Sequence, residues 1–175
     1  NFATTTPGTG CVSKVCSTPG HIGVDNANSA YITGEFTGSM TFEKASGKIV
    51  LKEKGKRDLY IAKLDKSGKF VWAVSFGGAE GESARGLAVH RKTGVVYVTA
   101  TFRSKATIVD TSGKTHTVTP QGTQTENLLF KLDTNGKVLW IHKVAGYGRF
   151  GHVAVDSAGD PYIVGYFWRT FSLGT

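Results

Sequence analysis

The chain has 175 residues, enough for one ordinary domain or two small ones, and no stretch approaches the roughly 18 apolar residues of a membrane span. Hydrophobic residues make up 39% and glycine contributes 23 residues, which is typical of short strands joined by tight turns and excludes a helical bundle. The net charge is +8, but the lysines are scattered over predicted turns, which indicates a solvated surface better than a nucleic-acid interface.

Residues 1–20 contain both cysteines, Cys11 and Cys16, in the segment GCVSKVCSTPG. A disulfide between them would close an irregular Gly/Pro/Ser-rich loop, and it implies an oxidising compartment. Two free thiols are the alternative, and zinc is not expected because no second Cys or His pair lies nearby at finger spacing.

Alternating apolar residues and turn signals predict a series of strands after this loop. The segments lie at 22–25, 31–36, 39–52, 58–65 and 70–76. The segment at 39–52 is a hairpin around a Ser-Gly turn. In the segment at 58–65, Leu59 and Ile61 alternate with polar neighbours, which indicates a strand with one buried face.

The same order of segments recurs along the chain. KLDKSGKFVW and KLDTNGKVLW share six of ten residues at an offset of 68, and Tyr31, Tyr97 and Tyr162 occupy matching places. The repeat is therefore 65 to 68 residues long, and the chain holds about two and a half copies. We place the end of a preceding repeat and the Cys-containing loop at 1–20, two repeats at 21–84 and 85–149, and the first half of another at 150–175.

Four predicted turns place Asp three residues before Gly: DKSG, DTSG, DTNG and DSAG. The Asp side chain can accept from backbone N–H groups of the turn, and Gly supplies a positive φ, so we expect hairpin loops. Calcium is not expected, because an EF-hand-like loop needs oxygen ligands from about five positions and these turns offer one acid or two.

Antiparallel sheets of four or more strands, repeated at a fixed long period, predict an all-β fold built of β-propeller blades. The usual blade has about 40 to 50 residues, and the additional hairpin at 39–52 explains the longer repeat of this chain. A sandwich and a solenoid are the alternatives, but a sandwich rarely repeats its own sequence and a β-helix rung is shorter.

Several segments resemble the SBBP family of β-propeller repeats. VAVDSAGDPYIVGYF resembles the first part of the family pattern, and DLYIAKLDKSGKFVW followed by SFGG resembles the second. The resemblance covers nearly everything from His21 to Thr175, although His90 replaces an Asp and KVAG replaces the second closing motif. It implies a secreted or cell-surface propeller, mostly without a known enzymatic activity, and thus an extracellular or cell-surface location.

A weaker resemblance concerns the tryptophans. The pattern D…GKVLW is similar to the tryptophan-docking motif of quinoprotein-type propellers, without implying a quinone site. It implies packing between blades for Trp72 and Trp140, and we expect the same of the matching Tyr31, Tyr97 and Tyr162. Trp168 replaces Thr37 and Arg103 of the other repeats, so a further set of aromatic residues can form either an interface or local packing. This set is Tyr166, Trp168 and Phe171.

The sequence contains no motif that predicts catalysis, a metal site or a cofactor. The five histidines lack ligand spacing, and no nucleophile elbow, zincin or P-loop pattern is present. Glu80 and Glu82 are a conceivable carboxylate pair for glycoside chemistry, but a polar loop between repeats is the simpler interpretation. GYGRFGH at 146–152 could hold a sugar or phosphate, or be a plain loop.

These features favour a non-enzymatic extracellular module for adhesion, scaffolding or assembly. A ring needs about four to eight blades, so we expect the remaining blades, or other copies of the chain, as partners. The alternative function is binding of acidic or neutral glycans, suggested by the charge and the surface aromatic residues. A propeller enzyme is the third possibility, and nothing in the sequence supplies its catalytic residues.

Overall fold

The computed structural model describes residues 20–144 and 146–171. Within these residues the regular elements are β-strands that pair antiparallel in sheets, which confirms the all-β prediction. No helix that could cross a membrane is found in this part of the chain.

Four strands of the first repeat form an antiparallel meander. They are β1 (His21–Val24), β2 (Ala30–Phe36), β5 (Asp58–Leu64) and β6 (Phe70–Gly78). Tyr31 on β2 lies opposite Lys63 on β5, and Lys63 lies opposite Trp72 on β6. The register shifts by a bulge directly after Lys63. One residue from each of three neighbouring strands therefore lines up across the sheet.

The second repeat forms a meander of the same design. Its strands are β7 (Ser83–His90), β8 (Val95–Phe102), β11 (Glu126–Leu132) and β12 (Val138–Val144). Tyr97 lies opposite Lys131, Lys131 lies opposite Trp140, and a bulge again follows the lysine. The sequence repeat is thus also a repeat of strand order, pairing register and local irregularity.

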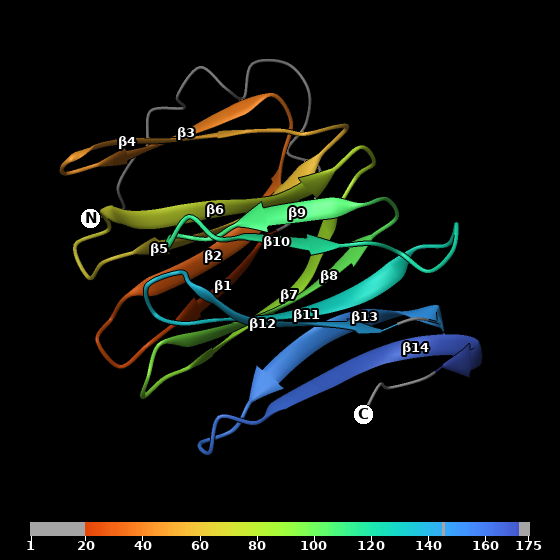
Figure 1. The fold of residues 1–175 in the computed structure, drawn as a ribbon. Coiled ribbons are helices and arrows are strands. Elements are labelled where there is room, and N and C mark those ends of the chain that lie inside the picture. The colour runs from red at the N-terminus through yellow and green to blue at the C-terminus, as the bar shows by residue number, and fades with distance from the viewer. Residues whose placement is uncertain (1–19, 145, 172–175) are drawn as a thin grey trace.

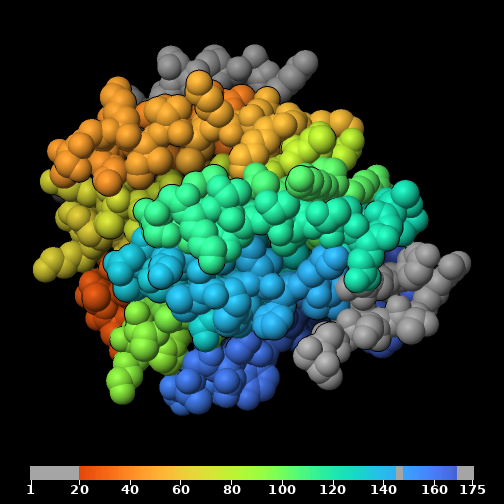
Figure 2. Space-filling model, viewed as in Figure 1, coloured from red at the N-terminus to blue at the C-terminus, as the bar shows by residue number. Residues whose placement is uncertain are grey.

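A hairpin is inserted between the second and third strands of each meander. The hairpins are β3 (Ser39–Lys44) with β4 (Gly47–Lys52), and β9 (Ala106–Val109) with β10 (Thr115–Val118). Strand β9 pairs with β6 of the first repeat, so a six-stranded sheet contains strands of both repeats. Figure 2 shows this hairpin in green to turquoise on the front of the molecule, below the orange β3–β4 hairpin.

The last described strands, β13 (Gly146–Val155) and β14 (Pro161–Phe171), form a two-stranded sheet. Figure 1 shows the sheets lying one over another, with β3–β4 at the top of the view and β13–β14 at the bottom. Strands β7 and β13 begin at Ser83 and Gly146, a few residues before the repeat boundaries expected from the sequence. None of the sheets formed by the described residues closes on itself.

The apolar core lies between successive sheets. Phe76 of the first repeat packs edge-on against Phe130 of the second, with ring centroids 5.0 Å apart, and both side chains are fully buried. A smaller cluster that includes Leu129 and Val153 joins the second meander to β13. A third cluster, around Phe42, lies within the first repeat. Because the other two are shared by neighbouring repeats, much of the apolar surface of a repeat is buried only against its neighbour.

The Asp–Gly turns have the predicted chemistry. In the β5–β6 turn, Oδ1 of Asp65 accepts hydrogen bonds from the backbone N–H groups of Ser67 and Lys69 at 2.8 and 3.0 Å. Gly68 has a φ of 79°, which side chains rarely tolerate. Asp133 binds the β11–β12 turn in the same way. The strongest local motif of the sequence therefore shapes hairpin turns.

Candidate functional site

A polar cluster joins the first meander to the second. We call the contact made by Tyr31, Lys63, Trp72 and Thr134 the first junction. Three of these residues come from the aligned row on β2, β5 and β6, and Thr134 lies in the β11–β12 turn. Lys63 Nζ donates to Thr134 Oγ1 at 2.7 Å, and Trp72 Nε1 donates to the Thr134 carbonyl at 3.0 Å.

The hydrogen bonds of this cluster form a directed chain. Tyr31 donates its hydroxyl proton to Asp25 Oδ2 at 3.0 Å, so the hydroxyl of Thr134, 2.9 Å away, must donate to Tyr31. Burial is the main cause that raises the pKa of Tyr31 to about 12, which keeps the phenol protonated at neutral pH. These hydrogen bonds thus connect the Lys63 ammonium to the Asp25 carboxylate through the hydroxyl groups of Thr134 and Tyr31.

Trp72 has a tightly fitted neighbour in the second repeat. Its side chain is 5% exposed, and a Cβ placed on Gly136 would come within 2.8 Å of the indole ring. Gly136 also has a φ of 84°, so both the turn and the close approach require glycine. The structure therefore places Trp72 and Tyr31 in the contact between the first and second meanders.

The second junction is built from the matching residues Tyr97, Lys131 and Trp140. Tyr97 OH donates to the carbonyl of Gly159 in the β13–β14 turn at 2.6 Å. Lys131 Nζ lies 5.2 Å from the centroid of the Tyr97 ring and 5.7 Å from that of Trp140. Among the described residues, neither Lys131 Nζ nor Trp140 Nε1 has a hydrogen-bond partner, in contrast to Lys63 and Trp72.

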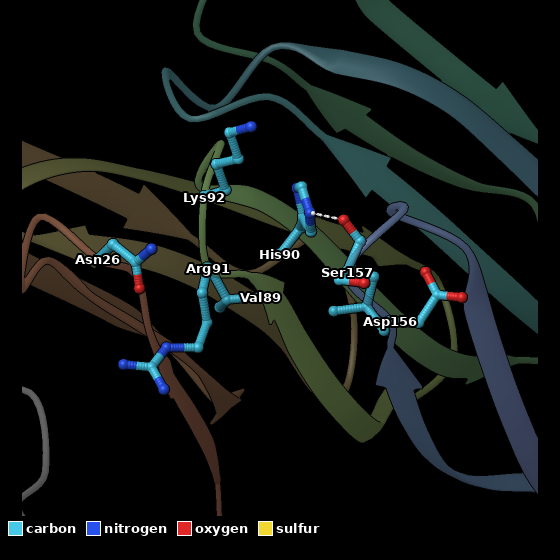
Figure 3. Close-up of a pocket in the computed structure, with 8 residues that line it drawn as sticks. Asn26, Val89, His90, Arg91, Lys92, Asp156 and Ser157 are labelled. Carbon is cyan, nitrogen blue, oxygen red and sulfur yellow. Dashed lines mark hydrogen bonds between the residues drawn. The ribbon is translucent and has the colours of Figure 1, made fainter.

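A pocket of about 460 Å³ lies where turns of the three repeats converge. Its lining is Asn26, Val89, His90, Arg91, Lys92, Val155, Asp156 and Ser157. Figure 3 shows Arg91 and Lys92 extending in different directions, whereas His90 points toward Ser157. His90 contacts Thr93 Oγ1 at 2.6 Å and the Ser157 carbonyl at 3.2 Å, so both ring nitrogens are engaged.

The chemistry of this pocket is that of a contact between turns. Oδ1 of Asp156 accepts three backbone N–H groups of its own turn, and Oδ2 accepts the hydroxyl of Tyr162. The Asn26 N–H donates to the Arg91 carbonyl at 2.8 Å, which joins the first repeat to the second. His90 meets Ser157 at its backbone carbonyl, and this contact and the Asn26–Arg91 hydrogen bond join turns of different repeats.

Glu80 and Glu82, considered as a carboxylate pair, have different surroundings. Glu80 forms an ion pair with Lys56 at 2.7 Å near the surface. Glu82 is fully buried and accepts the Gly78 N–H at 3.0 Å. The two carboxyl groups therefore do not form the pair that their spacing suggested.

Glu82 instead lies near Asp58, which is also fully buried. Asp58 Oδ1 accepts the Lys54 N–H at 3.2 Å, while Asp58 Oδ2 and Glu82 Oε1 are buried without a hydrogen-bond partner. Burial, with a contribution from the Asp58 charge, raises the pKa of Glu82 to about 7. Burial likewise raises the pKa of Asp58. Because neither carboxyl reaches the surface, this pair cannot contact a substrate in this conformation.

Sequence patterns did not predict the surroundings of Asp58, although one feature of them recurs in the second repeat. Glu126 occupies the matching start of β11, and it accepts the Gln121 N–H as Asp58 accepts that of Lys54. A Cβ on Gly77 would collide with the Asp58 carboxylate. In both meanders, an acid at the start of the third strand thus accepts a backbone hydrogen bond from the preceding loop. In the first meander, Gly77 leaves space for this acid.

Three arginines from separate segments of the chain, Arg57, Arg85 and Arg149, lie near one another. Arg57 forms an ion pair with the buried Glu35 at 2.9 Å. Burial and the positive charge of Arg149 lower the pKa of Arg85, and Arg85 Nε is buried without a hydrogen-bond partner. Sequence spacing did not predict this group, because Arg57 directly precedes β5 whereas Arg85 and Arg149 lie on β7 and β13.

The predicted interface residues lie on β14. Tyr166 and Trp168 are 59% and 50% exposed, and their rings stack with centroids 5.5 Å apart. Tyr162 is exposed, in contrast to the buried Tyr31 and Tyr97. The side chain of Phe171, like Cys11 and Cys16, lies outside the described residues.

No group of three or more His, Cys, Asp or Glu side chains in residues 20–144 and 146–171 is arranged to hold a metal ion. No protein-family model matches the chain, and no curated protein matches its sequence. The site must therefore be interpreted from its own geometry, which is dominated by the junctions between repeats.

Thr134→Val should lower the free energy of unfolding by about 1–3 kcal/mol, because the buried Tyr31 and the half-buried Lys63 lose a shared partner. Chemical denaturation measures the loss, and Thr41→Val on the exposed face of β3 is the control. In a double-mutant cycle with Tyr31→Phe, we expect a coupling of at least about 0.5 kcal/mol. Additive effects of the two substitutions would contradict the hydrogen-bonded chain.

Glu82 should make the protein less stable as the pH rises. Its folded-state pKa of about 7 exceeds the ordinary 4.5, so the native state holds the proton and stability falls between these pH values. At about 1.4 kcal/mol per unit, the loss is on the order of 3 kcal/mol.

Glu82→Gln should remove this fall and stabilise the protein at pH 8, as measured by urea denaturation across pH. Glu80→Gln is the matched control, because Glu80 is paired at the surface. An equal pH dependence in wild type and Glu82→Gln would show that Glu82 ionises normally in the folded state.

Proposed function

We propose that the chain is part of a β-propeller of the SBBP type that serves as a non-enzymatic structural and interaction module outside the cell or at its surface. The observation that carries this proposal is the repeated meander. Both meanders have the same strand order, register and bulge, and each packs its core against the following sheet. Radial repetition of such sheets is how a propeller is built.

The distribution of polar groups supports interaction over catalysis. The residues that recur from repeat to repeat bind neighbouring repeats or shape turns, as Tyr31 and Asp65 do. The acids with perturbed pKa values, Asp58 and Glu82, are fully buried. A disulfide between Cys11 and Cys16 would belong to the same proposal, since it suits an oxidising, extracellular setting.

Two and a half repeats are too few for a closed ring of about four to eight blades. The partners in this proposal are therefore further blades, contributed by a longer polypeptide or by other copies of the chain. Ile22 and Val24 on β1 are 68% and 44% exposed, whereas the matching Val89 on β7 is buried against the first repeat. The first repeat thus offers an apolar face of the kind that packs in the interior of the first junction.

We expect the chain to associate as its concentration rises, because apolar side chains are exposed at both ends of the described fold, on β1 and on β14. Light scattering after size-exclusion chromatography measures the mass, and negative-stain imaging distinguishes rings from filaments. A chain that stays monomeric at every concentration would contradict assembly from copies.

Glycan binding is the second candidate function, and one surface favours it. Arg149 on β13 lies opposite Tyr166 on β14, so both side chains share a face with Trp168, two residues further along. Stacked aromatic rings suit a sugar ring, and a guanidinium suits the carboxylate or sulfate of an acidic glycan.

If this surface binds acidic glycans, affinity for a sulfated polysaccharide should fall steeply with salt. Trp168→Ala should weaken binding by about three- to tenfold, whereas Val50→Ala on the distant β4 should not. Isothermal titration at two salt concentrations measures both effects. An affinity that changes neither with salt concentration nor with Trp168→Ala would exclude this surface as the glycan-binding site.

A further inference from the structure

Strand β14 differs from its counterparts in the first two repeats by having one neighbour where they have two. Strand β2 lies between β1 and β5, and β8 lies between β7 and β11, whereas among the described residues β14 pairs with β13 alone. The exposure of matching side chains follows this difference. Phe36 and Phe102 are 3% and 0% exposed, and Phe167 is 65% exposed.

The matching tyrosines give the same contrast. Tyr31 and Tyr97 are 0% and 1% exposed, and Tyr162 is 61% exposed. Yet Tyr162 already donates its hydroxyl to Asp156 Oδ2 at 3.2 Å, as Tyr31 does to Asp25. The residue is thus held in the same arrangement as the buried member of the first junction, with its ring uncovered.

An independent sign comes from the second junction. In the first junction, Lys63 and Trp72 bind Thr134, which lies in the turn between the third and fourth strands of the following repeat. Lys131 and Trp140 occupy the matching positions in the second repeat and have no such partner among the described residues. The group that would meet them belongs to the turn between the third and fourth strands of the third repeat.

Both observations point to the same element, and from them we propose that the open edge of β14 is the docking site of a β-hairpin with the sequence pattern of β11–β12. The pattern is an acid, alternating apolar residues, Lys-Leu-Asp, a turn ending in Gly, and a strand with Trp at its third position. This inference rests on the proposed propeller architecture and names the partner of one surface within it.

The register of this hairpin follows from the two complete repeats. Its lysine lies opposite Tyr162, as Lys63 lies opposite Tyr31 and Lys131 opposite Tyr97. The ammonium then covers the Tyr162 ring, as the Lys63 ammonium lies 5.0 Å from the centroid of Tyr31. Its turn reaches Lys131 and Trp140, and backbone hydrogen bonds along β14 supply most of the attachment.

A second intact copy of the chain does not fit this edge. In the described structure β5 already lies between β2 and β6, and β11 lies between β8 and β12. A copy therefore has no unpaired hairpin of this pattern to offer without dismantling one of its own sheets. The occupant is a hairpin additional to the two that the chain already uses.

The test is a chimera in which residues 104–144 are repeated directly after Trp168, so that the protein supplies its own copy of the hairpin. Hydrogen exchange is followed on the β14 amides at a concentration where the chain is monomeric. We expect slowing by about tenfold or more relative to the wild-type chain, because edge amides become paired. The fluorescence emission of the original Trp140 should also shift to shorter wavelength, because the hairpin covers its ring. To isolate this signal, every other tryptophan, including the one in the appended copy, is replaced by Phe.

Two matched controls define the mode of docking. The first control carries Leu128→Asp and Phe130→Asp in the appended copy alone. It has the same length as the chimera, and its β14 amides should exchange as fast as in the wild type. Thr134→Val in the appended copy alone tests the register, and it should lower Tm if the appended turn binds Lys131. An unchanged Tm would show that the hairpin, even if bound, does not adopt the register of the first junction.

The proposal is overturned if the β14 amides of the chimera exchange as fast as in the wild type while the β8 amides stay protected. The protein is then folded, but the hairpin does not bind the β14 edge. It is also overturned if association of the wild-type chain alone protects these amides, which makes a second copy the occupant. Absence of rings or filaments would count against the proposed propeller assembly and leave the exchange result unaffected, so the two failures are distinguishable.

Discussion

A chain of hydrogen bonds from Lys63 through Thr134 and Tyr31 to Asp25 fixes how one sheet lies on the next. Apolar contact between two sheets tolerates small shifts, because many relative positions bury a similar area. The polar groups of this contact do not, since each hydroxyl, ammonium or carboxylate group left without its partner costs free energy. The position of Trp72 over Gly136, and with it the depth of the shared core, follows from this alignment of the two sheets.

The sequence was most informative where the chemistry is local. An Asp three residues before Gly shapes its own turn, so the turns around Asp65 and Asp133 could be predicted without knowledge of the surroundings. The matching tyrosines and tryptophans could also be identified, because they occupy the same positions when the repeats are aligned. Their partner Thr134 could not, since the homologous position of the first repeat holds Lys66 and the contact crosses 71 residues from Lys63.

The charged residues show the limit of spacing arguments. Glu80 and Glu82 would share a face if they lay in a strand, but they precede β7, and the chain bends at Ala79 and Glu80. Glu82 consequently lies near Asp58, a residue that no local pattern associates with it. Arg57, Arg85 and Arg149 are similarly brought near one another from three separate segments of the chain. Such groups depend on which sheet edges meet, and hydrophobic periodicity carries no information on that.

The pairing of β9 with β6 ties the repeats together in a way that bears on how the molecule comes apart. Repeat proteins whose units contact one another through side chains alone can lose terminal units one at a time. Here three residue pairs, from Phe76 with Ile108 to Gly78 with Ala106, are backbone ladder contacts between units. Opening the second repeat therefore removes an edge of the sheet that belongs to the first, so unfolding of the two is coupled. Proteolytic nicking between the repeats would consequently leave them associated, as a two-part complex held by a continuous sheet.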